Sequence, residues 1–254
     1  MLLTIDIGNT QIAVGIFNKN NLIAHWRIST SASRTEDETW VLLQSLTAAQ
    51  QIDLNGITGI AISSVVPNVT AAFAKLSIKY LHLNPVIVNY KTSTGLIIHY
   101  DNPVNVGADR ICNAVAGYEK YGGPLIIVDF GTATTFDVIS KNREYLGGII
   151  APGIEMSSMI LHQKAAKLPS VELNFPDTVI GQSTEISMQS GLLYGTVEMV
   201  KGFVQKINIE LKQDAKIIVT GGLAKLVLQK LDNKFILEPF LTLQGLKIIF
   251  DKVK

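Results

Sequence analysis

The sequence predicts a mixed α/β protein built from two related halves, and three observations lead to this prediction. The 254 residues are 47% hydrophobic, which is enough to bury one large domain or two of about 100–150 residues each. A hairpin-rich opening gives way to alternating strands and helices, a rhythm typical of α/β folds. An apolar run followed by Asp-x-Gly occurs at Asp6 and again at Asp129.

The first half opens as an antiparallel meander, because turn residues separate three apolar runs at 2–7, 11–17 and 22–29. Helical spacing of apolar residues then predicts a helix over 36–51.

Strands and helices alternate through the rest of this half. GIAISSVVP (59–67) predicts a strand that stops at a proline, and Pro67 begins a helix because proline is tolerated in the first helical turn. PVIVNY (85–90) is a further strand. The segment 101–123 becomes helical in its second part, and Gly122-Gly123 ends that helix.

The second half repeats the design of the first. PLIIVDFGTATTFDVIS (124–140) has the same order as the opening: an apolar strand, an acid, a glycine, threonines and a second strand. Asp6 and Asp129 are 123 residues apart, close to half the chain. We therefore predict one domain over 1–121 and a second over 122–254.

Further along, YLGGIIAPG (145–153) predicts a strand, and KIIVTGGLA (216–224) a strand that enters a glycine turn and then a helix. Between them we expect a helix over 154–167, a loop over 168–184 and a long helix over 184–212. Gly191, Gly195 and Gly202 each weaken that long helix by about 1 kcal/mol relative to alanine, unless another backbone packs closely there.

Composition excludes several classes of function. A net charge of +1 gives no field for nucleic acid or an anionic membrane. The single cysteine, Cys112, excludes an intrachain disulfide and suits a reducing cytosol; with no base paired to it, we assign it no chemistry. No signal peptide is recognisable, and Asp6 and Asn9 interrupt the first apolar stretch well short of the ~20 residues that span a bilayer. We expect a cytoplasmic protein with no membrane partner.

The two Asp-x-Gly turns indicate phosphate chemistry. Glycine permits close approach to the backbone, and successive N–H groups in such turns bind anions. The adjacent carboxylate can hold the cation that accompanies phosphate. Two such turns facing each other would hold a polyphosphate, with a third glycine turn, Gly221-Gly222, beside the nucleoside. The alternative is a pair of ordinary hairpin turns with a capping aspartate.

Other phosphate and metal motifs are absent. The chain contains neither G-x-x-x-x-G-K-[ST] nor G-x-G-x-x-G, which argues against a P-loop enzyme and a Rossmann dehydrogenase. Its four histidines are scattered, with no H-E-x-x-H and no second cysteine, so each is interpreted as a surface or packing residue.

The motifs DIGNT, DFGTATT and VTGG resemble the phosphate-1, phosphate-2 and adenosine motifs of the actin-like and sugar-kinase superfamily. The whole chain resembles type III pantothenate kinase, most closely at YDNPVNVGADR (100–110), GGIIAPGI (147–154), LPSVEL (168–173) and IGQSTEISMQSG (180–191). The resemblance implies two related actin-like (ribonuclease H-like) α/β domains with mixed sheets, duplicated along the chain. It also implies ATP-dependent phosphorylation of the primary hydroxyl of pantothenate to 4'-phosphopantothenate, the first step of coenzyme A biosynthesis.

The resemblance further implies roles for individual residues. Asp109 would accept the proton, Asp129 would hold a monovalent cation (potassium or ammonium), and Thr184 would reach pantothenate across a homodimer interface. ATP would be used with Mg²⁺. The pantothenate pocket would be lined by Tyr100, Gly107, Ala108, Asp109 and Arg110. The contacts to ATP would be Asp6, Ile7, Gly8, Asn9, Thr10, Gln11, Ile12, Ala13 and Thr132.

The chemistry of GADR (107–110) suits these roles. A carboxylate beside a bound hydroxyl can take its proton as the oxygen attacks the γ-phosphorus of ATP. Arg110 can clamp a substrate carboxylate with two parallel N–H bonds. The alternatives are a first-turn acid at Asp109 that stabilises the helix dipole, a solvated Arg110, and a Tyr100 that packs beside Pro103.

Two other functions stay open at this point: a non-catalytic actin-like nucleotide-binding regulator, and a kinase of the same fold that acts on a sugar or another small hydroxy acid. Asp109 favours an enzyme, because a regulator has no need for a carboxylate beside a substrate arginine.

Overall fold

The structure is a computed structural model that describes residues 1–254. The chain forms two compact units. The first comprises Met1–Glu119 together with Phe240–Lys254, and the second comprises Lys120–Pro239.

The first unit contains a mixed five-stranded sheet in the order β3-β2-β1-β4-β5. Its strands are β1 (Leu2–Ile7), β2 (Gln11–Asn18), β3 (Asn21–Ser29), β4 (Gly59–Ser64) and β5 (Val86–Ile87). β1 is antiparallel to β2 and parallel to β4, so the predicted meander is confirmed. Ile5, Ile60 and Ile62 are fully buried in this sheet, and successive residues of β1 and β4 are buried, as expected for strands covered on both faces.

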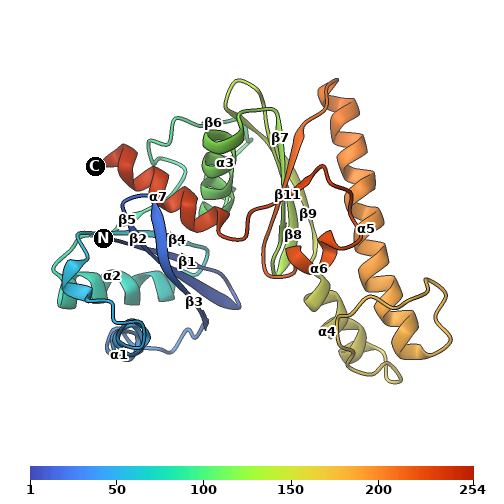
Figure 1. Ribbon diagram of the computed structural model, residues 1–254, viewed down its shortest axis with the longest axis horizontal. Helices are drawn as coiled ribbons and strands as arrows, with labels where there is room; N and C mark the ends of the chain where they lie inside the picture. Colours follow the sequence, from blue (N-terminus) through green and yellow to red (C-terminus); the bar gives the residue numbers. More distant parts are fainter. The chain divides into compact units, whose positions relative to one another are not determined.

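Four helices belong to this part of the chain: α1 (Glu36–Ala48), α2 (Pro67–Leu81), α3 (Ala108–Tyr121) and α7 (Leu241–Val253). Figure 1 shows α1 and α2 together on one side of the sheet, where Trp40 and Tyr80 stack with ring centroids 4.8 Å apart. A capping box between Thr35 and Glu38 begins α1. The helix ends earlier than the predicted 36–51, and Gln51 beyond it has a positive φ of 57°. Short 3₁₀ turns occupy Leu54–Gly56 and Pro103–Asn105, and β6 (Ile97–Ile98) is a two-residue strand.

Helix α7 places the end of the chain with the first unit, whereas the predicted halves assign all of 122–254 to the second. The apolar stripe of Leu243, Leu246 and Ile249 is buried, and α7 packs on β1, β2 and β4. Gly245 allows close contact, because a Cβ there would lie less than 3.0 Å from the backbone of Cys112 in α3. Burial of this stripe is the physical reason for the difference.

The second unit contains strands in the order β11-β10-β7-β8-β9. They are β7 (Leu125–Phe130), β8 (Ala133–Ile139), β9 (Glu144–Pro152), β10 (Lys216–Thr220) and β11 (Phe235–Leu237). β7 is antiparallel to β8 and parallel to β10, as β1 is to β2 and β4. Both units therefore have the same strand order, and the predicted mixed α/β fold with two mixed sheets is confirmed.

The helices of the second unit are α4 (Ile154–Lys164), α5 (Thr184–Leu211) and α6 (Ala224–Leu228). Figure 1 shows the long helix α5 running beside the sheet, and its buried residues Leu193, Val197 and Val200 join the core of this unit. The segment between α4 and α5 contains no helix or strand, which confirms the predicted loop. None of the helices combines the length and the apolar character that crossing a membrane requires.

Candidate active site

The first Asp-x-Gly turn closes the hairpin between β1 and β2. The N–H of Gly8 donates to the carbonyl oxygen of Gln11 at 3.0 Å, and the hydroxyl of Thr30 donates to the carbonyl oxygen of Gly8 at 2.7 Å. Asn9, Thr10 and Gln11 are exposed, and Asp6 is half-buried at the carboxyl end of β1. The turn therefore offers backbone groups to solvent beside a carboxylate.

Ile7 and Ile12 flank this turn with their side chains in the core, each 1% exposed. Any contact that these two predicted residues make with a nucleotide must come from their backbone. Gly8 and Ala13 are half-buried, so the part of 6–13 that solvent reaches is centred on the turn itself.

Asp109 lies at the start of α3, where its Oδ1 accepts a hydrogen bond of 2.8 Å from the N–H of Arg110. The carboxylate occupies the space beside Gly107, because a Cβ built on that glycine would lie less than 3.0 Å from Oδ1. Burial raises the pKa of Asp109, and it outweighs the backbone N–H and the charge of Arg110, which lower that pKa. The glycine of GADR thus makes room for a carboxylate that is withdrawn from bulk water.

Asp6 and Asp109 both act electrostatically on Cys112 within the first unit. Burial raises the pKa of the Cys112 thiol well above its usual value, and the charges of Asp6 and Asp109 raise it further. Ser63 lies against the same thiol and is the register partner of Asp6 across β1 and β4. Cys112 is therefore a protonated, buried residue, in agreement with the absence of any chemistry assigned to it.

Arg110 is only 7% exposed. The alternative of a solvated arginine at this position is therefore wrong. A buried guanidinium needs anionic or carbonyl partners, and Asp109 is one anionic neighbour. Tyr100, from the same motif, is half-buried.

The second Asp-x-Gly turn closes the hairpin between β7 and β8, in the other unit. The N–H of Gly131 donates to the carbonyl oxygen of Ala133 at 3.2 Å. The N–H of Gly153 donates to the carbonyl oxygen of Thr132, also at 3.2 Å, and a Cβ on Gly153 would lie less than 3.0 Å from that oxygen. The glycine of GGIIAPGI thus permits close contact with the turn that holds Thr132.

Gly221 passes directly over Asp129. It has a φ of +95°, and a Cβ there would lie 2.5 Å from Oδ1 of Asp129 and 2.6 Å from the backbone of Phe130. The Asp129 carboxylate therefore sits in a cradle of close backbone, which suits a cation bound through oxygen atoms. The structure holds no group of three or more His, Cys, Asp or Glu side chains that could bind a metal ion. A cation at Asp129 would thus need further oxygens from backbone, water or phosphate.

Thr184 begins α5 and lies elsewhere in the second unit, in a cavity of about 970 Å³. This cavity is lined by none of the other predicted site residues; its walls come from the end of β9, from α4 and α5, and from the loop between these helices. Gly191 and Gly195 line it too, and a Cβ added to either glycine, or to Gly202, would meet nothing within 4 Å. The close backbone that would explain these glycines is not supplied by this chain.

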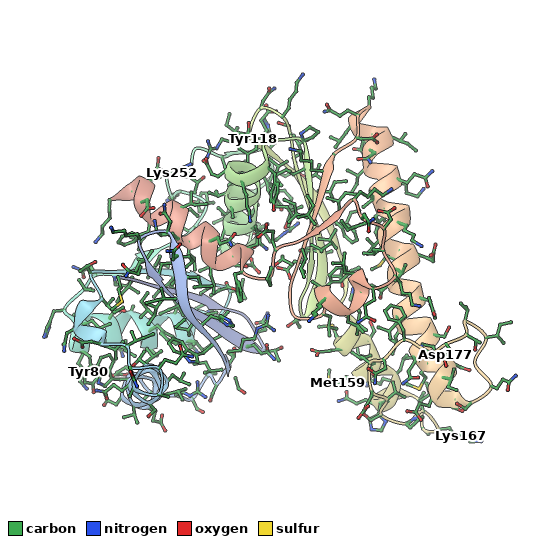
Figure 2. All side chains as sticks on the ribbon, in the orientation of Figure 1. Tyr80, Tyr118, Met159, Lys167, Asp177 and Lys252 are labelled. Atoms are coloured by element: carbon green, nitrogen blue, oxygen red, sulfur yellow. The ribbon has the colours of Figure 1, made fainter.

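Two large apolar side chains of this unit are exposed to solvent. Ile150 of β9 is 62% exposed and Met159 of α4 is 51% exposed. Figure 2 shows Met159 on α4 at the same end of the unit as Lys167 and Asp177 of the neighbouring loop.

Sequence analysis missed the segment Ser63–Val65, interpreting it only as the end of a strand. The register places it at the carboxyl end of β4, beside the end of β1 that carries Asp6. A signal for it existed, because ligands of open α/β sheets bind outside the carboxyl ends of parallel strands.

A sequence profile described as Type III pantothenate kinase matches residues 2–206. The type III pantothenate kinase of Geobacillus kaustophilus (strain HTA426) is 47% identical over 252 residues, covering 99% of this chain and 98% of the relative. That of Geotalea daltonii is 48% identical with the same coverage.

Solved structures agree in fold. The activator of the 2-hydroxyisocaproyl-CoA dehydratase from Clostridium difficile superposes with a TM-score of 0.60 at 12% identity, covering 99% of this chain and 94% of that chain. A ROK family glucokinase from Streptomyces griseus gives a TM-score of 0.50 at 14% identity, covering 98% of both chains. At these identities the likeness concerns the fold alone, and it agrees with the expected duplicated actin-like architecture.

Proposed function

This chain belongs to the type III pantothenate kinase family, and from that premise we propose how its residues perform the reaction. The enzyme transfers the γ-phosphoryl group of ATP to the primary hydroxyl of pantothenate, which yields 4'-phosphopantothenate for coenzyme A biosynthesis. The observation that carries our assignment is the carboxylate of Asp109, half-buried in the space that Gly107 leaves open and next to buried Arg110.

Asp109 is the proton acceptor in this proposal. The hydroxyl oxygen of pantothenate forms a bond to the γ-phosphorus, the bond between that phosphorus and the β,γ-bridging oxygen breaks, and ADP leaves. The hydroxyl proton passes to Asp109. In phosphoryl transfer the orientation of the acceptor matters more than its basicity, and the bond from the Arg110 N–H fixes one carboxylate oxygen. A pKa raised by burial also makes Asp109 a stronger base than an exposed aspartate.

Arg110 binds the carboxylate of pantothenate in this scheme, together with Tyr100, Gly107 and Ala108 as neighbours. Its burial favours the role, because a desolvated guanidinium binds a carboxylate more strongly than an exposed one does.

ATP is bound by residues 6–13 and Thr132 in our proposal, mainly through backbone groups of the two turns. Membership of the family implies a divalent cation with ATP. Mg²⁺ is usually held by one or two carboxylates plus the substrate phosphates, and the half-buried carboxylate of Asp6 fits that requirement. When bound, the ion neutralises negative charge on the phosphates.

Asp129 is proposed as the ligand of a monovalent cation. Its carboxylate lies under Gly221 in a backbone cradle that a Cβ would fill. We expect activity to need potassium or ammonium in addition to magnesium. Equal rates in sodium-only and potassium buffers would contradict this role.

The active form is proposed to be a homodimer in which Thr184 completes the pantothenate site of its partner. The open glycines of α5 support an interface at this helix, and the exposed Ile150 and Met159 show that the unit has apolar side chains available for one. Light scattering on the active enzyme tests this, and a fully active monomer would remove Thr184 from the site.

Two further proposals concern organisation and location. The equal strand order of the two sheets supports a duplication with its boundary near Gly122, even though α7 packs with the first unit. The single buried cysteine and the use of ATP support a cytoplasmic location.

The experiment that tests the function is a substrate panel with ATP and an ADP-release assay. Pantothenate should be turned over, and sugars and other small hydroxy acids should not. A protein that binds ATP but turns over no member of the panel would instead be the non-catalytic regulator. Faster turnover of a sugar would favour the other kinase.

A further inference from the structure

The side chain of Val65 is apolar but lies outside the core of the first unit. It follows β4, whose residues from Gly59 to Ser63 are buried, yet Val65 is 39% exposed. Its neighbour Val66 packs against the core, whereas Val65 does not. An exposed valine next to a buried strand needs no explanation by itself, but its surroundings give it one.

The backbone around Val65 is held in place by several hydrogen bonds. The N–H of Val65 donates to the carbonyl oxygen of Ile7 at 3.1 Å, which ties the segment to the end of β1. The N–H of Val66 donates to the hydroxyl of Ser64 at 3.0 Å, and the hydroxyl of Thr70 donates to the same oxygen at 2.6 Å. Pro67 then begins α2. The position of Val65 is therefore well defined.

Val65 and Asp109 lie on the same small region of the surface. A Cβ built on Gly107 would have Cγ1 of Val65 at 3.7 Å and Oδ1 of Asp109 at less than 3.0 Å. Both groups are thus within 4 Å of one point, an apolar methyl and a carboxylate oxygen side by side.

Pantothenate has matching groups next to each other: a hydroxyl for the Asp109 carboxylate and methyl groups for the Val65 methyl. Pantothenate carries its primary hydroxyl on a methylene, and the next carbon is quaternary with two methyl groups. A hydroxyl within about 2.6–3.2 Å of the Asp109 carboxylate brings those methyl groups close to it. Apolar contact requires carbon atoms within about 4.0–4.5 Å, a distance that the placement of Val65 allows.

We propose that Val65 is a specificity-determining residue whose side chain packs against the two methyl groups of pantothenate and selects for them. The inference rests on the proposed role of Asp109 as proton acceptor, because that role fixes where the hydroxyl lies. Val65 thereby distinguishes a hydroxyl next to a dimethyl carbon from the unbranched alcohol of a sugar or a short hydroxy acid.

The test measures kcat/KM for pantothenate and for the analogue that has hydrogens in place of both methyl groups. The wild-type enzyme should prefer pantothenate, since a methylene-sized group in an apolar pocket is worth about 10–200-fold. Val65→Ala should lower this preference about tenfold. The change should come from a lower kcat/KM for pantothenate, while kcat/KM for the analogue stays nearly unchanged. Val65→Thr, which keeps the shape and adds a hydroxyl, should shift the preference in the same direction.

Val253→Ala serves as the control variant. Val253→Ala removes a valine of similar exposure, 37%, from the last turn of α7 and should leave the preference unchanged. If Val65→Ala and Val65→Thr lower kcat/KM by the same factor for both substrates, or keep the wild-type preference for pantothenate, Val65 has no role in specificity. A wild-type enzyme that turns over neither compound would instead overturn the function itself. Melting temperature and ATP affinity report that each variant is folded.

Discussion

The two Asp-x-Gly turns are close copies in their strands and differ in what lies over them. Asp6 and Asp129 occupy the same place in β1 and β7, two strands with the same burial pattern. Each has an antiparallel partner on one side and a parallel strand on the other. The shared part is the scaffold, and differences between the turns therefore point to different ligands.

The main difference lies in the residues at the carboxyl end of the neighbouring parallel strand, β4 in the first unit and β10 in the second. At the end of β4, only Ser64 separates Ser63 from Val65, whose N–H bonds to the carbonyl oxygen of Ile7. After β10, Gly221 and Gly222 separate Thr220 from Leu223, whose N–H bonds to Phe130 at 3.4 Å. Leu223 packs against its core, whereas Val65 stays exposed.

The two turns therefore differ in the groups that border them, and this difference suits them to different roles. The first turn is bordered by side chains, Val65 and Asp109, which suits recognition and chemistry on a substrate alcohol. The second turn is bordered by bare backbone over Asp129, which suits the cation that we propose there. Three variants and one pH dependence would break or sharpen this comparison.

Asp109→Asn should have the largest effect. Asparagine is nearly isosteric and caps helices well, so the fold and ATP affinity should persist. Turnover should fall by about 10²–10⁴, the usual contribution of a general base. Steady-state kinetics and nucleotide titration on the same variant measure both quantities.

Glu36→Gln is the matched control, since Glu36 is likewise an acid in the first turn of a helix, α1. It should leave kcat intact. A folded, ATP-binding Asp109→Asn enzyme with near-normal turnover would reduce Asp109 to a first-turn acid and remove the difference between the turns.

Gly107→Ala should come next. The new Cβ would overlap Oδ1 of Asp109, so the carboxylate must move. A displacement of about 1 Å in an active site can cost about 10²-fold, and we expect a loss of that size in kcat with little change in melting temperature. Unchanged kcat would show that the position of Asp109 does not matter.

Gly221→Ala should act on stability and cation use in the second turn. Its φ of +95° disfavours a side chain, and the added Cβ would meet Asp129 and Phe130. We expect the free energy of unfolding to fall by about 1–3 kcal/mol, with a higher potassium requirement. Ser64→Gly, at the corresponding exit in the first unit, should leave the potassium requirement unchanged. Thermal melts measure the effect on stability, and potassium titrations measure the effect on cation use.

The pH dependence of stability should show the smallest effect. Burial raises the pKa of Asp109 above its ordinary value of 3.8, so the folded state binds its proton more tightly than the unfolded state does. This contribution to stability is fully present below pH 3.8 and is lost as pH rises through the folded pKa. At neutral pH Asp109→Asn should therefore melt about 2–4 °C higher for each kcal/mol of relief. The gain should vanish in acid; a variant less stable than wild type at pH 7 would contradict it.

Much of this arrangement is readable in the sequence because glycine and aspartate in tight turns leave a strong pattern. DIGNT and DFGTATT predict both hairpins, and GADR predicts a carboxylate and an arginine at a helix start. The burial of Arg110 is not readable, because it depends on packing from elements distant in the sequence. Val65 was hidden for a similar reason, because its approach to Gly107 joins residues that are distant in the sequence. The place of α7 was equally hidden, since its apolar stripe carries no mark of the sheet it covers.

The return of α7 to the first unit has a consequence for how the enzyme is made. Residues 240–254 are synthesised after the entire second unit, yet they cover Gly59 and pack against α3, where Thr242 donates a hydrogen bond of 2.8 Å to Asn113. On the ribosome, α3 therefore waits for its packing partner until translation has passed residue 240. A nascent chain cut short before that point lacks the helix against which α3 packs. We therefore expect phosphorylating activity only from chains whose translation has gone past the second unit.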